Sequence, residues 1–361
     1  MRKTLLVMAG GTGGHVFPAL AVAGLLKERG WHIAWMGNPD SFEARTVPPH
    51  GYEMAWVRFG ALRGKGLLRK LLLPLTLLSA FRQARREIRS IKPDVVLGMG
   101  GYISFPGGMM ASLLDYPLVI HEQNSIAGLA NRVLARLADR IICGFPDTLH
   151  KGEWMGNPVR AEIAILAEPA VRFAEREKEQ SAEQRRPLHL LVMGGSLGAS
   201  AINEVVPKGL ALIPEEERPL VVHQAGEKHL ATLEENYAAA GVQANCVAFI
   251  QDMAGAYEWA DLVLCRSGAL TVSELAAAGV ASILVPFPFA VDDHQTANAR
   301  FLSSVGGAFL LPQDEMTPES ISRIRNYSPE QLLQMAERSR TLAKPEAAVE
   351  VARVCEEMCR R

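Results

Sequence analysis

RSGALTVSELAAAGVASILVPFPFAVDDHQTAN, from Arg266 to Asn298, contains the pattern from which the fold class can be inferred. An apolar strand at 262–264 runs into Ser267-Gly268-Ala269, and a segment with helical periodicity begins near Leu270. A second apolar strand, 281–285, follows that helix. Strand, helix and strand in this order indicate a parallel sheet with helices packed against it.

The same stretch carries polar groups that suit a nucleotide sugar. The helix would leave backbone N–H groups unsatisfied at its N-terminus, and these favour a phosphate. Glu274, within the first turn or so, would repel a phosphate but could accept hydrogen bonds from a diol such as ribose. A polar cluster opens the next helix: Asp293, His294, Gln295 and Asn298. An ordinary strand–helix–strand unit with a capped helix is the alternative, and local chemistry alone does not separate the two.

The composition is typical of a globular protein with room for two domains. The chain has 361 residues, of which 48% are hydrophobic and 21% are charged. Its five cysteines contain no Cys-x-x-Cys pair, which argues against a zinc site and a disulfide framework and favours a reducing cytosol. The opening MRKTLLVMAGG resembles a signal peptide only superficially, because its short apolar run passes straight into a glycine loop. We predict a first strand there.

Charge is distributed unevenly along the chain. Residues 1–160 hold 20 Lys or Arg and 11 Asp or Glu, whereas residues 161–361 hold 18 and 28, so only the first half suits an anionic surface. The segment Arg58–Lys92 has ten basic residues and one acid, Glu87, around a leucine-rich middle at 67–78. This pattern favours peripheral binding to anionic phospholipid over a core-facing helix with a solvated basic face. The expected lipid contacts are Arg63, Lys65, Arg69 and Lys70.

Strand and helix patterns alternate through two similar halves. Each half opens with strand, glycine loop and helix, and we expect a boundary near Arg160, giving domains at 1–160 and 161–342. The segment 343–361 contains a helix without a strand partner, which could pack back on the first half. Residues 167–187 are rich in Glu, Arg and Gln, and we expect an exposed helix or loop there. The predicted strands are 4–8, 33–36, 94–97, 118–121, 140–142, 188–193, 220–223, 246–249, 262–264, 281–285 and 308–310.

Three glycine-rich loops each follow an apolar strand. They are Gly10–Gly14, Gly98–Gly101 and Gly194–Gly198. The carboxyl edge of an open α/β sheet is where ligands bind, so these loops would lie at the binding edge. Three such loops favour a role in phosphate binding or close ligand approach over tight turns alone.

The usual cofactor motifs are incomplete. Gly11 and Gly13 fit the dinucleotide fingerprint, but Val16 occupies the position of its third glycine. No Walker sequence is present, because Lys65 is followed by Gly66 rather than Ser or Thr. No Asp-x-Asp occurs either, so a metal-assisted diphosphate mechanism is unsupported. We expect no cofactor and no metal, with a leaving diphosphate stabilised by helix N-termini and Arg160.

A run of four polar residues, His121-Glu122-Gln123-Asn124, directly follows another predicted strand. It would lie at the same edge of the sheet as the glycine loops. Polar residues in such a place belong to a binding or catalytic site more often than to a capped turn, and we interpret the run as part of a site.

Taken together, these motifs resemble glycosyltransferase family 28, and the resemblance covers nearly the whole chain. It rests on GGTGGHVFPALAVA, LRGKG, KPDVVLGMGGY, HEQNSIAGLANR, GNPVR, GGSLGA, CRSGALTVSELAAAG and DDHQTANA. Leu197 stands where many relatives have Gln, and the segment before His294 varies, which affects only fine contacts.

The resemblance implies a GT-B fold, in which two Rossmann-like domains with parallel sheets face a central cleft. It also implies inverting, metal-independent transfer of N-acetylglucosamine from UDP-GlcNAc to undecaprenyl-diphospho-N-acetylmuramoyl-pentapeptide, in peptidoglycan synthesis at the cytoplasmic face of the inner membrane. No nucleic acid partner is expected.

The resemblance also assigns roles to residues. Ile250 would meet the uracil, Glu274 the ribose and Gln295 the sugar hydroxyls, while a glycine loop and Asn124 would contact the sugar and the acceptor. The full set of substrate-binding residues is Thr12, Gly13, Gly14, Asn124, Arg160, Ser196, Ile250, Ala269, Leu270, Thr271, Val272, Ser273, Glu274 and Gln295.

Two side chains are candidates for the catalytic base: His15, directly after the first glycine loop, and Glu122. A histidine is ordinarily mostly neutral at pH 7 and can accept a proton, whereas a carboxylate is a weaker base unless burial raises its pKa. We favour His15. The competing functions are a UDP-GlcNAc epimerase of the same fold, which has no use for a basic leucine-rich patch, and a non-catalytic nucleotide-sugar-binding protein, which has no need of His15 and Glu122.

Overall fold

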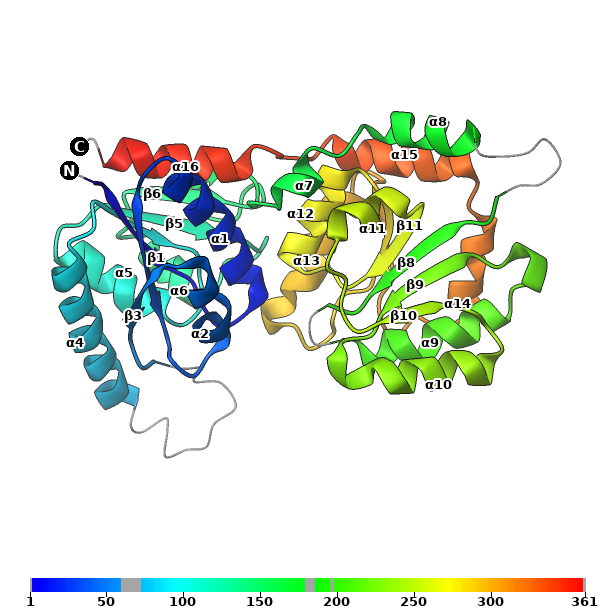
Figure 1. Ribbon diagram of the computed structural model, residues 1–361, viewed down its shortest axis with the longest axis horizontal. Coiled ribbons are helices and arrows are strands. Elements are labelled where there is room, and N and C mark those ends of the chain that lie inside the picture. Colours follow the sequence, from blue (N-terminus) through cyan, green and yellow to red (C-terminus); the bar gives the residue numbers. More distant parts are fainter. Residues whose placement is uncertain (1, 60–72, 179–185, 196–197, 360–361) are drawn as a thin grey trace. The chain divides into compact units, whose positions relative to one another are not determined.

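The computed structural model describes residues 2–59, 73–178, 186–195 and 198–359 (Figure 1). The chain forms two compact units. Unit 1 comprises Met1–Arg160 together with Pro345–Arg361, and unit 2 comprises Ala161–Lys344. The basic positions Arg63, Lys65, Arg69 and Lys70 lie outside the described residues.

Unit 1 is built on a parallel sheet of seven strands in the order β3-β2-β1-β4-β5-β6-β7. The two strands that were not predicted, β3 and β7, lie at its edges, where half-exposed residues give little apolar signal. The strands are β1 (Thr4–Met8), β2 (His32–Gly37), β3 (Glu53–Trp56), β4 (Val95–Gly98), β5 (Leu118–Glu122), β6 (Arg140–Cys143) and β7 (Glu153–Trp154).

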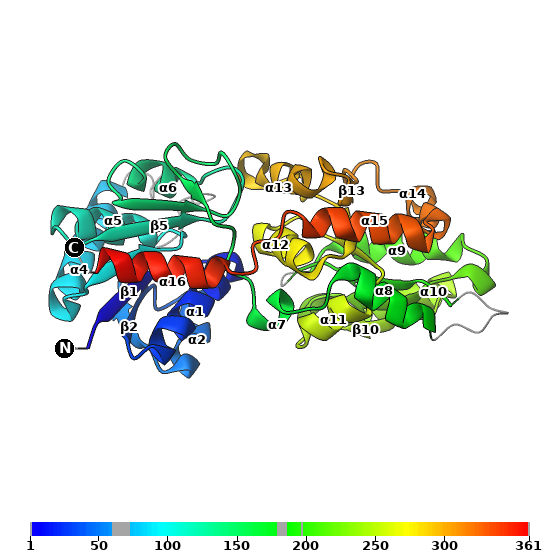
Figure 2. The same ribbon diagram turned by 90° about the horizontal axis from the view of Figure 1, so that it is seen from above.

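Helices cover both faces of the sheet of unit 1 (Figures 1 and 2). They are α1 (Gly13–Glu28), α2 (Phe42–Thr46), α4 (Leu73–Ile91), α5 (Ser104–Leu113), α6 (Leu129–Leu134) and α16 (Ala347–Met358), with a 3-10 turn η1 (Pro48–His50). Although α16 is far from unit 1 in sequence, it packs along α1 and against β4. Its residues Val351, Ala352, Val354, Cys355 and Met358 are buried in the same core as β1 and α1. Unit 1 therefore takes part of its core from the C-terminal segment.

Unit 2 repeats the design with six parallel strands in the order β10-β9-β8-β11-β12-β13. The strands are β8 (His189–Met193), β9 (Leu220–Gln224), β10 (Asn245–Val247), β11 (Leu262–Cys265), β12 (Ala281–Leu284) and β13 (Ala308–Leu310). The helices are α7 (Ala161–Ala164), α8 (Pro169–Lys178), α9 (Ser200–Ala211), α10 (Leu230–Ala240), α11 (Met253–Trp259), α12 (Ala269–Ala278), α13 (His294–Ser303), α14 (Pro318–Ser322) and α15 (Pro329–Arg340). Four 3-10 turns, η2 (Glu215–Glu217), η3 (Glu227–His229), η4 (Val291–Asp293) and η5 (Arg323–Asn326), complete it.

Both sheets are doubly wound, which confirms the predicted α/β class. The strand order reverses between β1 and β4 in unit 1 and between β8 and β11 in unit 2. Ligands of such sheets bind at the carboxyl ends of the strands beside this reversal, because the following helices leave on opposite faces there. The glycine loops after β1, β4 and β8 all occupy that position.

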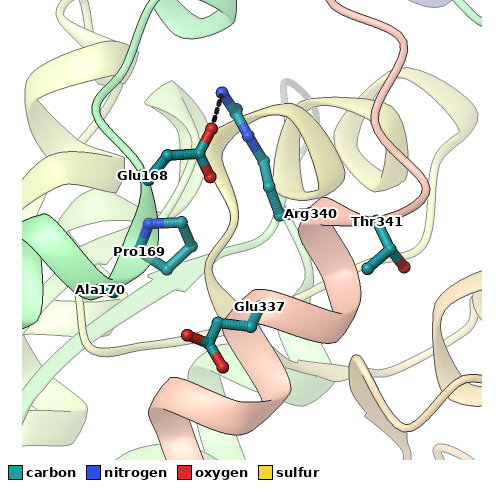
Figure 3. A pocket seen from close by; sticks show the side chains of 6 residues that line it. All are labelled: Glu168, Pro169, Ala170, Glu337, Arg340 and Thr341. Carbon is teal, nitrogen blue, oxygen red and sulfur yellow. Dashed lines mark hydrogen bonds and ion pairs between the residues drawn. The ribbon is translucent and has the colours of Figure 1, made fainter.

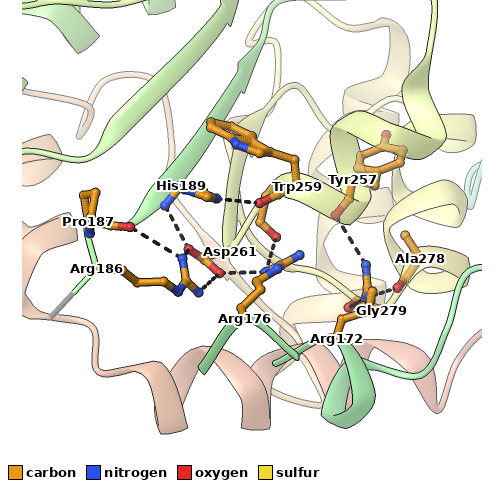
Figure 4. Close-up of polar contacts among 11 residues, drawn as sticks. Arg172, Arg176, Arg186, Pro187, His189, Tyr257, Trp259, Asp261, Ala278 and Gly279 are labelled. Carbon is orange, nitrogen blue, oxygen red and sulfur yellow. Dashed lines mark hydrogen bonds and ion pairs between the residues drawn. The ribbon is translucent and has the colours of Figure 1, made fainter. Parts of the chain in front are cut away.

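An exposed helix or loop was expected at 167–187, and α8 is a helix that is exposed over most of its length, although Pro169, Arg172 and Phe173 are buried. Arg172 is buried and donates hydrogen bonds to the carbonyl oxygens of Tyr257 (3.3 Å), Gly279 (2.6 Å) and Ala278, the last two at the end of α12 (Figure 4). A composition rich in Glu, Arg and Gln predicted a solvated segment, but the carbonyl oxygens that accept from Arg172 are distant in sequence. A composition argument cannot detect such partners.

A second cluster in Figure 4 centres on the buried Asp261. Its carboxylate accepts hydrogen bonds from Arg176 (2.7 Å), Arg186 (2.6 Å) and the His189 backbone N–H (2.8 Å). Burial alone would raise the pKa of Asp261, but these hydrogen bonds and the two positive charges hold it below its usual range. Because Asp261 directly precedes β11 and His189 opens β8, this cluster lies at the amino edge of the sheet, opposite the glycine loop. Its role is structural.

Candidate active site

The first glycine loop of unit 1 connects β1 to α1. Thr12 caps the helix in an extended conformation, and Gly13 and Gly14 begin the helix, so that His15 lies in its first turn. The buried carboxylate of Glu43 supports the loop from below by accepting hydrogen bonds from the backbone N–H groups of Gly11 (2.9 Å) and Asn38 (3.0 Å). The ring of His15 is half-buried, and the hydrogen bonds of Glu43 fix the backbone of the loop that precedes it.

The second glycine loop packs directly on the first. Gly100 and Gly101 have φ of 94° and 83°, a region that side chains rarely tolerate. A Cβ at Gly101 would collide with the Gly10 carbonyl oxygen, and one at Gly100 would lie 2.7 Å from His15 Nδ1. Glycine is thus required here because backbone and ring approach closely.

A chain of hydrogen bonds leads from His15 into the interior of unit 1. His15 Nδ1 lies 3.0 Å from Gln123 Oε1, Gln123 Nε2 lies 3.1 Å from His121 Nδ1, and His121 Nε2 lies 2.9 Å from the Gly156 carbonyl oxygen. Gln123 and His121 are buried. Burial lowers the pKa of His121 to about 4, so that ring is neutral at physiological pH.

The carboxylate of Glu122, the alternative base, accepts hydrogen bonds from neighbouring groups. Its side chain is 2% exposed. One carboxylate oxygen accepts a hydrogen bond from Asn124 N (2.9 Å), and the other accepts from Gly128 N (3.1 Å) and Asn131 Nδ2 (2.9 Å). These contacts shape the loop before α6 and the half-buried Asn124 within it. Both carboxylate oxygens of Glu122 are thus engaged by donors of unit 1.

In unit 2 the N-terminal turn of α12 follows β11. Leu270, Thr271 and Ser273 are half-buried. The side chain of Val272 is fully buried, and its N–H donates a hydrogen bond to Gly268 O (2.9 Å). Val272 and Ala269 are therefore the residues of this turn whose side chains are buried.

Glu274 lies at the start of the second turn of α12. Its side chain is 4% exposed, and the Tyr257 hydroxyl donates a hydrogen bond to Glu274 Oε2 (3.3 Å). The same helix therefore presents an N-terminal turn and, beneath it, a carboxylate that is oriented by a tyrosine.

Gln295 ties together the loops after β11 and β12. Its Oε1 accepts a hydrogen bond from Phe287 N (2.9 Å), and its backbone oxygen accepts one from Ser267 Oγ (2.8 Å). Asn298 Nδ2 donates to the Ser267 carbonyl oxygen (3.1 Å). With its oxygen engaged, the side chain of Gln295 can act towards a ligand as a donor through Nε2.

The remaining predicted contacts lie on neighbouring loops. Ile250 is half-buried after β10, and Gln224 Nε2 joins this loop to the third glycine loop through the carbonyl oxygens of Ala248 (3.2 Å) and Gly195 (3.1 Å). The guanidinium of Arg160 lies over the ring of Phe17 on α1, 5.9 Å from its centre. Ser196 is outside the part of the chain that the structure describes.

Several residues that shape these edges were missed by the sequence analysis. They are Glu43, Gln224 and Tyr257, whereas His121 and Gln123 belong to the polar run that was interpreted as part of a site. Gln224 had a usable signal, because it ends the apolar run of β9. A glutamine at the carboxyl end of a buried strand points to a buried polar contact at the binding edge.

A surface pocket elsewhere in unit 2 is not part of this site (Figure 3). It is lined by Glu168, Pro169, Ala170, Glu337, Arg340 and Thr341. Arg340 pairs with Glu168 across it (3.4 Å), and Pro169 adjoins Gly279, just before β12. The pocket therefore lies at the amino edge of the sheet. Within the described ranges, no group of three or more His, Cys, Asp or Glu side chains could hold a metal ion.

Comparison with known proteins identifies similar chains over the full length. Residues 5–143 match the glycosyltransferase family 28 N-terminal domain, and residues 189–352 match the family's C-terminal domain. The chain is 65% identical over 360 residues to a UDP-N-acetylglucosamine–N-acetylmuramyl-(pentapeptide) pyrophosphoryl-undecaprenol N-acetylglucosamine transferase of Dechloromonas aromatica, with 100% of both chains covered.

Two solved structures extend the comparison. The crystal structure of Acinetobacter baumannii MurG is 39% identical, with a TM-score of 0.84 and coverage of 98% of this chain and 99% of that one. A UDP-GlcNAc 2-epimerase from Neisseria meningitidis bound to UDP-GlcNAc has a TM-score of 0.64, with 98% and 100% of the chains covered, but only 12% identity. The second likeness concerns the fold alone.

Proposed function

The chain belongs to glycosyltransferase family 28 and has the predicted GT-B fold class, and we propose that it transfers N-acetylglucosamine from UDP-GlcNAc to undecaprenyl-diphospho-N-acetylmuramoyl-pentapeptide in peptidoglycan synthesis. The Dechloromonas aromatica transferase, 65% identical over the whole chain, supports this reaction. The epimerase resembles this chain in fold only, so it gives no comparable support to the alternative function.

The observation that carries the proposal is that α12 has two features that suit a nucleoside diphosphate. The turn at Ala269–Thr271 offers backbone N–H groups to a diphosphate, and Glu274, oriented by Tyr257, can accept hydrogen bonds from a ribose diol. We assign the donor to unit 2, with Ile250 at the uracil and Gln295 at the sugar hydroxyls. The acceptor and the membrane are assigned to unit 1.

The proposed chemistry is a single inverting displacement. The acceptor hydroxyl oxygen forms a bond to the anomeric carbon as the bond from that carbon to the UDP oxygen breaks. UDP leaves with the electron pair, and its charge is stabilised by the N-terminus of α12 and by Arg160. The hydroxyl proton passes to His15 Nε2.

The direct test supplies UDP-GlcNAc and the lipid-linked muramoyl-pentapeptide to the purified protein. We expect a lipid-linked disaccharide with a β-linkage, because the donor is an α-glycoside and the displacement inverts it. Release of UDP-N-acetylmannosamine without acceptor would indicate the epimerase, and UDP-GlcNAc binding with no product would indicate a binding protein. Either outcome would contradict the proposal.

Replacing Glu274 with alanine is expected to weaken UDP binding by about 1.5–3 kcal/mol, the range for hydrogen bonds to a charged group. Calorimetric titration with UDP measures this change. Glu258→Ala on the neighbouring α11 serves as a control that removes an exposed carboxylate outside α12. Equal UDP affinity in Glu274→Ala and the wild type would remove Glu274 from the ribose site.

The membrane contact is proposed for α4 of unit 1. The buried face of this helix consists of Ala80, Ala84 and Ile88, while Leu75 and Leu78 are 65% and 45% exposed at its N-terminal end. Arginines are exposed along the rest of the helix: Arg82, Arg85, Arg86 and Arg89. Exposed leucines with adjacent arginines suit the interface of an anionic membrane. In the described ranges, no helix is long and apolar enough to cross a bilayer.

Reversing the charge of Arg82, Arg85 and Arg89 to Glu is expected to weaken binding to anionic phospholipid vesicles by about 3 kcal/mol, at about 1 kcal/mol for each basic residue near the surface. Co-sedimentation with vesicles measures binding, and UDP titration checks that unit 2 is intact. The control reverses three exposed basic residues of unit 2: Lys208, Arg323 and Arg325. If the two triple variants sediment alike, α4 is not the membrane contact.

A further inference from the structure

We infer that Gln123 is a positioning residue that holds His15 in the tautomer with hydrogen on Nδ1, so that Nε2 is the bare nitrogen available to the acceptor hydroxyl. The inference rests on the proposed function, in which His15 accepts that proton. It goes further by naming the device that selects which ring nitrogen does so.

The protonation pattern follows from the inner end of the chain. The Gly156 carbonyl oxygen can only accept, so His121 Nε2, 2.9 Å away, must carry the hydrogen. His121 is buried and neutral, because burial lowers its pKa to about 4, and its Nδ1 therefore has a lone pair and no hydrogen. That lone pair requires a donor.

The amide of Gln123 is that donor, and this sets its orientation. Its Nε2 lies 3.1 Å from His121 Nδ1 and 3.3 Å from the His121 carbonyl oxygen, so both amide hydrogens have acceptors. A flipped amide would place Oε1 against these two acceptors. Two contacts thus force Oε1 towards His15 Nδ1 at 3.0 Å. Since Oε1 can only accept, His15 Nδ1 must donate.

Neighbouring residues restrict the positions of Gln123 and His15. Asn157 Nδ2 donates to the Gln123 carbonyl oxygen (3.0 Å), and a Cβ at Gly100 would lie 3.2 Å from Gln123 Oε1 as well as close to the His15 ring. The contact between His15 and Gln123 therefore lies directly beneath the second glycine loop. When Nε2 takes the hydroxyl proton, Gln123 Oε1 remains hydrogen-bonded to Nδ1 and its partial negative charge stabilises the imidazolium.

The test combines nitrogen NMR of ¹⁵N-histidine-labelled protein with kinetics. The two-bond ¹H–¹⁵N pattern of a neutral imidazole reports which nitrogen is protonated, and the His15 signals are assigned by their loss in His15→Asn. In the wild type at pH 8 we expect hydrogen on Nδ1. In Gln123→Met, which is similar in length and cannot accept the hydrogen bond, we expect a shift towards the Nε2–H form that free histidine favours in water. In that variant kcat should fall up to about 10²-fold with KM for UDP-GlcNAc unchanged.

The controls separate this inference from the proposed function. Asn203→Leu removes an amide that contacts the buried His223 (3.1 Å) in unit 2, and it should lower Tm without changing the His15 pattern. A wild-type His15 with hydrogen on Nε2 overturns the inference, even if Gln123→Met does not fold. Unchanged kcat in a folded Gln123→Met overturns it while leaving the transferase assignment intact. Absence of disaccharide product in the wild type overturns the proposed function itself, whatever the tautomer.

Discussion

Replacing His15 with alanine is expected to lower kcat by about 10²–10⁴-fold, the contribution of a positioned general base. The loss arises because the acceptor hydroxyl must shed its proton as the new glycosidic bond forms, and Glu122 is occupied by Asn124, Gly128 and Asn131. Turnover at saturating concentrations of both substrates measures the effect, and UDP binding should be unchanged.

Two variants make this measurement specific. His150→Ala removes an exposed histidine of unit 1 and should keep wild-type turnover. His15→Asn retains a hydrogen-bonding side chain of smaller size but cannot accept the proton, so it should be as slow as His15→Ala. Near-normal turnover in His15→Ala would exclude His15 as the base.

Replacing Asp261 with leucine is expected to reduce the free energy of unfolding of unit 2 by about 3–5 kcal/mol, because it leaves the partly buried charges of Arg176 and Arg186 without their counter-ion. Denaturant unfolding followed by tryptophan fluorescence measures the change in a variant whose four unit 1 tryptophans are replaced by Phe, so that the signal comes from Trp259, whose carbonyl contacts the neighbouring His189. A loss below about 1 kcal/mol would show that the cluster behaves like an exposed ion pair.

The matched control is Glu217→Ala, which removes the partner of the exposed Arg325 and should cost little. The pH dependence has a definite sign. Because the folded-state pKa of Asp261 lies below its ordinary value of 3.8, its stabilisation is present at neutral pH and is lost only as the pH falls below about 4 through that lowered pKa. The difference between wild type and Asp261→Leu should shrink at that end of the pH range.

The features of this protein that could be predicted from sequence are those marked by apolar runs and glycine loops. The central strands β1, β4, β5, β8 and β11 are buried on both faces and read as continuous apolar segments, so they were located from sequence. Edge strands carry a weaker signal: β3 is largely exposed apart from Ala55. Arg172 and Asp261 show the same limit for polar residues, since their burial depends on partners more than 70 positions away.

The site was predictable as a set of loops but not as a set of contacts. His15, Gly100 and Gln123 follow β1, β4 and β5, and they meet because those strands are neighbours in the sheet. The sequence predicted parallel strands without their order, so it could not show that Gln123 touches His15. The hydrogen bonds that engage the carboxylate of Glu122 could likewise be seen only in the structure.

The packing of α16 on α1 has a consequence for biosynthesis. Unit 1 takes Val351, Ala352, Val354, Cys355 and Met358 into its core, yet these residues are translated only after the whole of unit 2. A nascent chain therefore carries unit 1 with an uncovered apolar strip while unit 2 is being made. Unit 2, whose residues are contiguous, can complete its core first. Unit 1 is the part expected to need protection by chaperones on the ribosome.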